Sequence, residues 1–253
     1  MAGSIYRIRP VLTGTMKVDQ GAYLTWGGGV GKEVVIPATA WVIEGAPYPI
    51  LVDTGMADSE RASKWHHDGI QEPGQDMPSQ VRKLGIDPEE VVLLILTHLH
   101  WDHTHNMKAF KNAKRIVHRR ELAFALDPIP QYYRSYEAYQ LGLEAPFKGL
   151  EFELVDGERE VLPGITVFPT FGHCPGHQAV EVRTERGPYV IAGDAVMVYE
   201  NLRGDPEARM PLIPPGRFTD AIASWESLKA IAGRATHALP GHDMRVFDKE
   251  VYP

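Results

Sequence analysis

A largely apolar run from Val91 to Thr97 leads directly into three histidines and one aspartate, and this junction constrains the fold more than any other part of the chain. A short apolar run without polar alternation is typical of a strand buried on both faces. The polar cluster that follows consists of His98, His100, Asp102 and His103. Polar side chains at the end of a buried strand indicate a site at the edge of a sheet.

Other short apolar segments, bounded by Gly, Pro and Asp, alternate with helical patterns. The strand candidates cover residues 40–44, 50–53, 115–118, 165–170, 179–184, 189–192 and 236–239, and the helix candidates cover 79–84, 119–126 and 220–232. We expect Ser79 to cap its helix and the last helix to end at Gly233. That last helix would place Ile222, Trp225, Leu228 and Ile231 on one apolar face. Strands interspersed with helices predict α/β layers.

Composition narrows the classes of function. The 253 residues are 43% hydrophobic and 23% charged, as in an ordinary globular protein, and we expect a single domain over residues 1–253. A net charge of −7 without a block of Lys and Arg argues against a nucleic-acid partner. No apolar run reaches the roughly 18 residues of a membrane span. We expect a cytoplasmic protein, because no apolar stretch follows Arg7 and Arg9 and Cys174 is the only cysteine.

The histidine cluster favours metal chemistry. Histidine is the commonest neutral metal ligand, and a carboxylate adds the charge that a divalent cation prefers. In an extended stretch, alternate residues share a side, so His98 and His100 point the same way. Asp102 and His103 must then turn back toward a second point, which suits two adjacent metals better than one. The alternative is a set of hydrogen-bonded polar residues at a strand end.

Three later segments each carry a ligand-type side chain just after an apolar strand. They place His173 in Gly172-His173-Cys174-Pro175-Gly176-His177, Asp194 in Ala192-Gly193-Asp194 and His242 in Pro240-Gly241-His242. The whole series, His-x-His-x-Asp-His followed by His, Asp and His, resembles the ligand set of the metallo-β-lactamase superfamily. The resemblance extends from the Leu51-Val52-Asp53-Thr54-Gly55 turn to His242.

The resemblance implies an αββα sandwich and a dinuclear centre. One metal would be held by His98, His100 and His173, and the other by Asp102, His103 and His242, with Asp194 bridging both. Zinc is the first choice for this set, and Fe, Mn or Co are alternatives. Asp53 and His177 resemble supporting positions that orient the ligands. The alternative for both is an ordinary turn residue.

Hydrolysis of a small molecule by metal-bound hydroxide is the reaction that the resemblance implies, with Asp102 or Asp194 moving a proton. Within the superfamily the chain most resembles the N-acyl-homoserine lactone lactonases, the enzymes of quorum quenching. This resemblance rests on chain length, on residues 172–178 and 240–243 and on the excursion at 128–149. The expected function is therefore that of a dinuclear zinc lactonase. The alternatives are hydrolysis of another cyclic amide, ester or thioester, and a non-catalytic metal carrier.

The substrate pocket is where the chain departs from these lactonases. They commonly place a Tyr three residues after the bridging Asp, and this chain has Met197 there. Tyr199, or a tyrosine of the excursion such as Tyr132 or Tyr133, is the expected substitute. His105 either lines the pocket or crowds it. Residues 128–149 form either a substrate lid or a surface excursion with packed aromatics.

The remaining signals are weaker. We expect His66 and His67 to be exposed loop residues, and His118 and His237 to be structural. Cys174 is expected to be a buried, inert thiol rather than a ligand. The glycine-rich residues 27–32 lack the pattern of a phosphate loop, and they favour a flexible loop near the pocket mouth. A homodimer is possible, although no single feature of the sequence indicates one.

Overall fold

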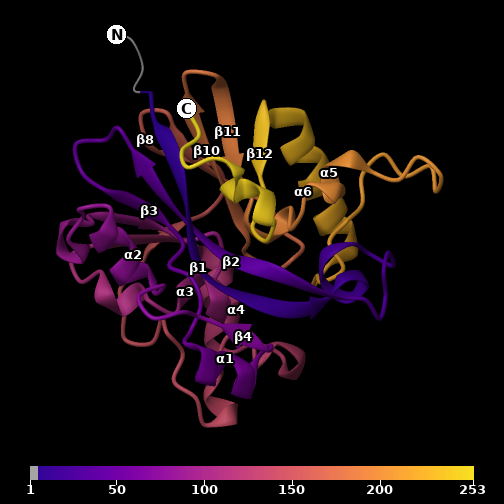
Figure 1. Ribbon diagram of the computed structural model, residues 1–253, viewed down its shortest axis with the longest axis horizontal. Helices are drawn as coiled ribbons and strands as arrows, with labels where there is room; N and C mark the ends of the chain where they lie inside the picture. The colour runs from indigo at the N-terminus through magenta and orange to yellow at the C-terminus, as the bar shows by residue number, and fades with distance from the viewer. Residues whose placement is uncertain (1–4) are drawn as a thin grey trace.

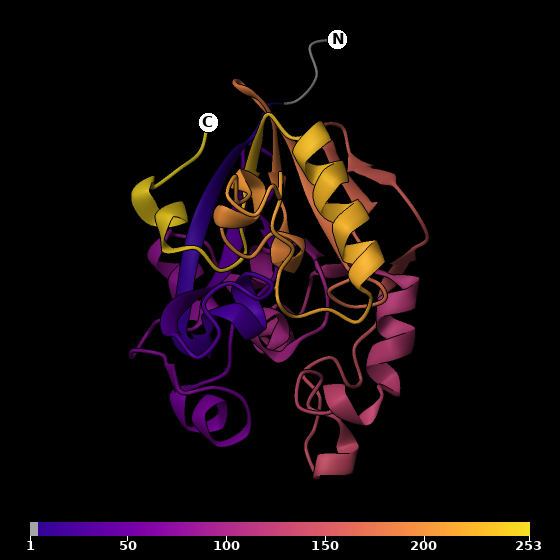
Figure 2. The same ribbon diagram turned by 90° about the vertical axis from the view of Figure 1, so that its right-hand side faces the viewer.

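Two β-sheets pack face to face, and helices cover their outer faces (Figures 1 and 2). The computed structural model describes residues 5–253. The larger sheet has the strand order β4-β1-β2-β3-β5-β6-β7, and the smaller sheet has the order β12-β11-β10-β9-β8. This arrangement confirms the αββα sandwich expected from the sequence. None of the helices within the described residues is long and apolar enough to cross a bilayer.

The larger sheet begins with a long antiparallel hairpin and continues with parallel strands. Its members are β1 (Arg7–Asp19), β2 (Glu33–Glu44), β3 (Ile50–Val52), β4 (Gly69–Ile70), β5 (Leu93–Ile95), β6 (Lys114–His118) and β7 (Glu153–Val155). Strands β3, β5, β6 and β7 run parallel to one another. Strand β5 is shorter than the predicted segment 91–97, because the Thr97 N–H donates to the Asp53 carboxylate instead of a neighbouring strand.

The smaller sheet is mainly antiparallel. Its members are β8 (Arg159–Leu162), β9 (Ile165–Pro169), β10 (Gln178–Thr184), β11 (Gly187–Ile191) and β12 (His237–Leu239). Strand β12 pairs with β11 in parallel, after a connection that contains α6. The predicted strands of this half of the chain therefore form, with ends that differ by one or two residues.

The main core lies between the sheets, and period two decides which side chains reach it. In β5, Leu93 and Ile95 enter this core, whereas Leu94 packs on the opposite face beneath the helices. In β9, Ile165 and Val167 enter it, and Phe168 faces the outer layer. Because both faces of each sheet are covered, a strand such as β5 is apolar throughout.

The outer layers contain short helices on the larger sheet, and the long helix α6 with the short helix α5 beside it on the smaller. They are α1 (Ser59–Trp65), α2 (Met77–Lys83), α3 (Trp101–Thr104), α4 (Arg119–Leu126), α5 (Glu200–Arg203) and α6 (Ala221–Arg234). The predicted cap of α2 is wrong. Asp76 caps that helix by accepting from the Ser79 N–H, and Pro78 occupies its first turn, where no donor is needed.

Helix α6 packs its inner face on the smaller sheet, and Figure 2 shows it along one side of the molecule. The helix ends at Arg234 rather than before Gly233, and Ile222 is 73% exposed instead of facing the core. A spacing of three residues drifts by about 60° per step, so Ile222 and Ile231 lie on opposite sides. The buried stripe contains Ser224, Ser227, Leu228 and Ile231.

Candidate metal centre

The ligand-type side chains all follow strands that end at one edge of the sandwich. His98, His100, Asp102 and His103 come directly after β5 in the larger sheet. In the smaller sheet, His173 lies between β9 and β10, Asp194 follows β11 and His242 follows β12. The two sheets therefore each contribute part of one site, which explains why residues so distant in sequence come together.

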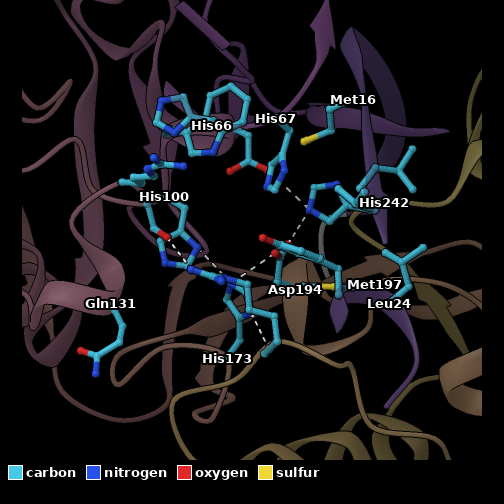
Figure 3. A pocket seen from close by; sticks show the side chains of 18 residues that line it. Met16, Leu24, His66, His67, His100, Gln131, His173, Asp194, Met197 and His242 are labelled. Carbon is cyan, nitrogen blue, oxygen red and sulfur yellow. Dashed lines mark hydrogen bonds and ion pairs between the residues drawn. The ribbon is translucent and has the colours of Figure 1, made fainter. Parts of the chain in front are cut away.

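These side chains form two groups. His98, His100, His173 and Asp194 offer atoms that all lie within 4.8 Å of one another, and Asp102, His103 and His242 form the second group. In Figure 3, His100, His173, Asp194 and His242 point toward a common centre. The structure thus brings together all seven side chains that the sequence singled out.

Asp194 connects the two groups through its separate oxygens. Its Oδ2 lies 3.2 Å from His173 Nε2 and 4.0 Å from His98 Nε2. Its Oδ1 lies 3.1 Å from His103 Nε2 and 3.0 Å from His242 Nε2. One carboxylate therefore faces both groups, with one oxygen directed to each.

The chemistry of the donors fits metal ions. Four buried atoms of these side chains, His98 Nε2, His100 Nε2, His103 Nε2 and Asp194 Oδ1, have no hydrogen-bond partner within residues 5–253. Buried polar atoms are nearly always paired, so a cluster of unpaired ones needs an explanation. Imidazole nitrogens and carboxylate oxygens are ligands for divalent transition metals. The two groups fit a dinuclear metal centre.

The ionisation of the histidines is set by burial and by neighbouring charge. Burial, reinforced by His103 and His100, holds the pKa of His98 well below its ordinary value, so its imidazole is neutral. Burial lowers the pKa of His103 as well, but Asp194 and Asp102 outweigh it and raise that pKa well above the usual range. A neutral imidazole is the form that binds a cation, so a proton must leave His103 when a metal binds there.

Asp53 supports the site from behind. Its carboxylate accepts from the Thr97 N–H at 2.8 Å and from the Thr97 hydroxyl at 2.7 Å, and its Oδ2 lies 2.8 Å from His103 Nδ1. Its backbone has a φ of 60°, an unusual value for a residue other than glycine. The contact leaves His103 Nε2 facing Asp194, and a supporting role of Asp53 stays a prediction.

His177 and two backbone carbonyls fix further members of the groups. The Asp194 N–H donates to His177 Nε2 at 3.0 Å, and burial lowers the pKa of His177 to about 3, so this nitrogen is free to accept. His242 Nδ1 donates to the Pro37 carbonyl at 2.8 Å. His173 Nδ1 donates to the Arg217 carbonyl at 3.1 Å. The other ring nitrogen of each of these two histidines therefore faces Asp194.

Glu121 in α4 is a supporting residue that sequence reasoning missed. It is fully buried, and its carboxylate accepts from the Leu99 N–H at 2.9 Å, the Gly176 N–H at 3.2 Å and the Tyr136 hydroxyl at 2.9 Å. Leu99 lies between His98 and His100, so Glu121 fixes the loop that carries both. A glutamate in the first turn of a predicted helix gives no signal of this role.

The comparison with known families decides the affiliation of the chain. Residues 34–242 match the model of the metallo-beta-lactamase superfamily, which is most of the chain. The chain belongs to the metallo-β-lactamase superfamily. The match includes all seven side chains of the two groups and Asp53, so the family resemblance of the motifs is confirmed.

Curated relatives of this superfamily member include N-acyl homoserine lactonases. The chain is 31% identical over 227 residues to the N-acyl homoserine lactonase of Bacillus thuringiensis, which covers 85% of this chain and 84% of the relative. It is 27% identical to the N-acyl homoserine lactonase AttM of Azorhizobium caulinodans, with 85% of each chain covered.

Solved structures support the same fold. An N-acyl homoserine lactone hydrolase with the product N-hexanoyl-L-homoserine at its catalytic metal centre has a TM-score of 0.79 at 22% identity, over 97% of this chain and 96% of that one. AidC, a dizinc quorum-quenching lactonase, has a TM-score of 0.68 at 15% identity, over 96% and 91%. These likenesses confirm the metallo-β-lactamase fold.

A pocket opens above the two groups of metal-ligand side chains, and its two walls differ in polarity (Figure 3). Met16, Leu24 and Met197 lie on one side, and Gln131 lies on the other. The full lining consists of Met16, Val18, Tyr23, Leu24, Ile36, His66, His67, His100, Trp101, Asp102, Gln131, Arg134, Ser135, His173, Asp194, Met197, Arg217 and His242. The pocket therefore has an apolar wall and a polar wall above the candidate metal centre.

The structure places the expected pocket tyrosines elsewhere. Tyr199 lines a separate cavity with Tyr252 and Arg245, because its side chain packs toward the core between the sheets. Tyr132 packs beside His100 with ring centroids 6.4 Å apart, and its hydroxyl donates to the Phe218 carbonyl, so it supports the wall from behind. Tyr133 is half-buried and does not reach the lining. Met197 is the one residue of this expected set that faces the pocket.

His66 and His67 are not exposed loop residues, as the sequence suggested, but line the pocket. The missing signal was α1, a short helix that ends at Trp65 and turns the two histidines inward. The His66 ring stacks on Trp101 at 4.0 Å. Burial lowers the pKa of His67 to about 4, so its imidazole is neutral near pH 7.

The remaining single residues lie in different surroundings. Cys174 is fully buried, and burial raises the pKa of its thiol well above the usual range, which fits an inert thiol. His118 is buried and caps α4 by accepting from the Arg120 N–H. His237 is exposed beside Tyr189. His105 is outside the pocket lining, with its Nδ1 buried behind the wall.

Proposed function

We propose that this chain is a metal-dependent hydrolase that opens the ring of a lactone of the N-acyl-homoserine lactone type. The observation that carries the proposal is the carboxylate of Asp194, whose two oxygens face two separate groups of metal-ligand side chains at the floor of one pocket. Curated relatives with about 85% coverage are N-acyl homoserine lactonases, which supports this substrate class.

The distances between the side chains divide them into two sets, one for each of two cations. His98, His100 and His173 would hold one, and Asp102, His103 and His242 would hold the other, with Asp194 shared. When bound, the pair supplies Lewis-acid chemistry, which polarises a carbonyl and makes water acidic enough to serve as a nucleophile at neutral pH. Zinc is the metal we propose, since histidine and carboxylate ligands suit it.

The chain's own residues supply proton transfer and orientation. Asp102 lines the pocket, and its Oδ2 lies 3.7 Å from both His103 Nε2 and His242 Nε2. We assign to this carboxylate the proton that leaves the attacking water and then reaches the alkoxide oxygen of the opened ring. The neutral imidazole of His67 faces the same pocket. We assign to it the hydrogen-bonding role of the tyrosine that the lactonases have at the position of Met197.

The segment 128–149 stays a proposed lid. It contributes Gln131, Arg134 and Ser135 to the pocket wall, and the Trp101 N–H donates to the Ser135 carbonyl at 2.9 Å. These contacts support the proposal, because movement of a segment that lines the pocket would change access to it. A cytoplasmic location, a single-domain organisation and a homodimer likewise stay predictions, which fractionation, limited proteolysis and light scattering test.

The test of the proposed function measures acid release from lactones at pH 7 by zinc-loaded protein. We expect ring opening of N-hexanoyl-homoserine lactone, about two metals per chain, and a loss of at least about 100-fold in kcat/KM for Asp194→Asn. His237→Ala, an exposed histidine outside the site, is the matched control and retains activity. A fully loaded enzyme that leaves every lactone intact would overturn the proposal.

The alternatives appear as distinct outcomes of the same assay. Turnover of cyclic amides, linear esters or thioesters without lactones would assign another substrate class to the same centre. Full metal loading without turnover of any lactone, amide, ester or thioester would instead indicate a metal carrier. Neither alternative has a structural observation in its favour.

A further inference from the structure

Two guanidinium groups line the pocket, and among the described residues no carboxylate pairs with them. Arg217 and Arg134 both reach the polar wall, and neither forms an ion pair with any side chain within residues 5–253. The chain carries a net charge of −7, so acidic partners are plentiful elsewhere. The two carboxylates in the lining, Asp102 and Asp194, both belong to the candidate metal centre.

Arg217 is held in place by uncharged groups. Its Nη2 donates to the Ser135 hydroxyl at 2.8 Å. Its guanidinium carbon lies 5.1 Å from the Tyr132 ring centroid and 5.5 Å from the Tyr23 ring centroid. Aromatic faces and one hydroxyl position a cation without neutralising it. The single hydrogen bond leaves further N–H donors of the guanidinium for a ligand.

The position of Arg217 makes it part of the pocket's architecture rather than a surface cation. Its backbone carbonyl accepts from His173 Nδ1, and its N–H donates to the Tyr23 carbonyl. The backbone of Arg217 is thus anchored directly beside His173 of the candidate metal centre. Arg134 is exposed and lines the outer part of the same wall. The two cations therefore provide an inner and an outer position for negative charge.

A neutral lactone needs only hydrogen-bond donors and an apolar surface. Two unpaired cations add attraction for an anion, and a guanidinium matches a carboxylate with two parallel N–H···O bonds. Met16, Leu24 and Met197 supply the apolar surface on the other side. The pocket is thus built for a molecule with an apolar portion and a carboxylate that is separate from the ring being opened.

We propose that Arg217, assisted by Arg134, binds a carboxylate substituent of the substrate, so that the preferred substrate is an anionic lactone. This inference rests on the proposed lactone hydrolysis and makes Arg217 a residue that determines specificity. The ion pair forms in a partly enclosed pocket, and it weakens at high salt because screening reduces the attraction.

A matched pair of lactones tests the inference. N-hexanoyl-homoserine lactone is compared with the same molecule whose acyl chain ends in a carboxylate. We expect wild type to favour the carboxylated lactone by about tenfold in kcat/KM, because one hydrogen bond between charged groups stabilises a complex by about that factor. The preference shrinks in 1 M NaCl, as the screening of charge requires. Equal kcat/KM values for the two lactones in wild type would overturn the inference.

Variants separate charge from structure. Arg217→Met abolishes the preference for the carboxylated lactone, Arg217→Lys keeps part of it, and Arg134→Met reduces it to a smaller extent. Arg186→Met, an exposed arginine in the turn between β10 and β11, is the matched control and leaves the ratio unchanged. A ratio that survives in Arg217→Met contradicts the assignment.

A binding measurement separates failure of this inference from failure of the proposed function. Hexanoate and hexanamide are compared in metal-free protein by ligand-observed NMR, because the metals would themselves attract a carboxylate. We expect wild type to bind hexanoate more tightly than hexanamide and Arg217→Met to bind both equally. This result stands even where no lactone is opened. Equal affinity of wild type for hexanoate and hexanamide would contradict the proposed anion site.

Discussion

Gly193 stands directly before Asp194, where the chain leaves β11 and approaches two residues of the site. Its φ is 50°, a region that side chains disfavour. A Cβ here would lie 2.7 Å from His177 Nε2 and 3.0 Å from the Thr97 Cβ. Both neighbours are fully buried, so neither has room to move. The backbone that carries Asp194 therefore depends on the absence of a side chain at this position.

Gly193→Ala should lower the free energy of unfolding by roughly 2 kcal/mol, from backbone strain and overpacking together. Gly233→Ala is the matched control, because Gly233 lies within α6 and a Cβ there meets nothing within 4 Å. The control should be neutral or stabilise the fold by up to about 1 kcal/mol. Urea denaturation of the metal-free proteins measures both. Equal stability of the two variants would contradict the close approach at Gly193.

At this scale the sequence singled out the side chains that the structure brings together, because much of their signal is local. His98, His100, Asp102 and His103 lie within one short stretch, and the pattern of residue types is informative without the fold. Arg217 was not singled out. An isolated arginine in a loop has no local pattern, and its function arises from Tyr23, Tyr132 and Ser135, which the fold brings to it.

At the scale of elements, α1 and the segment 128–149 are joined through Glu137. The Glu137 side chain is fully buried, and its backbone has a φ of 48°. Its carboxylate accepts from Arg61 Nε at 2.6 Å and Arg61 Nη2 at 2.8 Å, and it lies 3.0 Å from His66 Nε2. Because His66 stacks on Trp101 in the pocket wall, this network ties the proposed lid to α1.

Glu137→Gln should destabilise the fold by about 1–3 kcal/mol near pH 7, since it weakens charged hydrogen bonds in a buried network. Burial alone would raise the pKa of Glu137, but the hydrogen bonds from His66 and Arg61 outweigh it and lower that pKa below 4.5. A lowered folded pKa means that the stabilisation is present above about pH 4.5 and is lost as the pH falls through the folded value. The gap between wild type and variant should therefore shrink in acid.

Urea midpoints of both metal-free proteins between pH 7 and pH 3 check this dependence. Glu144→Gln is the control from the same segment, because the Glu144 side chain pairs with Lys108 on the surface, and surface pairs contribute little. The control should leave the midpoint unchanged. A gap for Glu137→Gln that stays constant across the range would mean that the ionised carboxylate contributes nothing.

The element scale is also where sequence reasoning reached its limit. Strands with apolar runs were predicted, because the covered faces of β5 and β9 impose that composition. Helix α1 was missed, because its residues Ser59–Trp65 are mostly polar and only Ala62 is fully buried. Once α1 was missed, His66 and His67 had no reason to be placed in the pocket.

At the scale of the molecule, the candidate metal centre joins the two sheets. His98 to His103 follow β5 of the larger sheet, whereas Asp194 and His242 follow β11 and β12 of the smaller one. Without cations, five imidazoles and two carboxylates meet at this edge with several buried atoms unpaired. Binding of two cations would therefore stabilise the contact between the sheets as well as enable catalysis.

Removal of metal should consequently lower the stability of the whole molecule. A ligand that binds only the folded state at about 1,000 times its Kd adds roughly 4 kcal/mol, which for a chain of about 250 residues corresponds to some 8–16 °C in Tm. We expect zinc-loaded protein to melt higher than chelated protein by this margin, and zinc to restore the loss. Asp194→Asn should reduce the shift more than Asp102→Asn, because only Asp194 directs oxygens to both groups. Calorimetry with and without chelator measures each shift. An unchanged Tm on chelation, with metal loss verified by elemental analysis, would mean that the sheets hold together at this edge without cations.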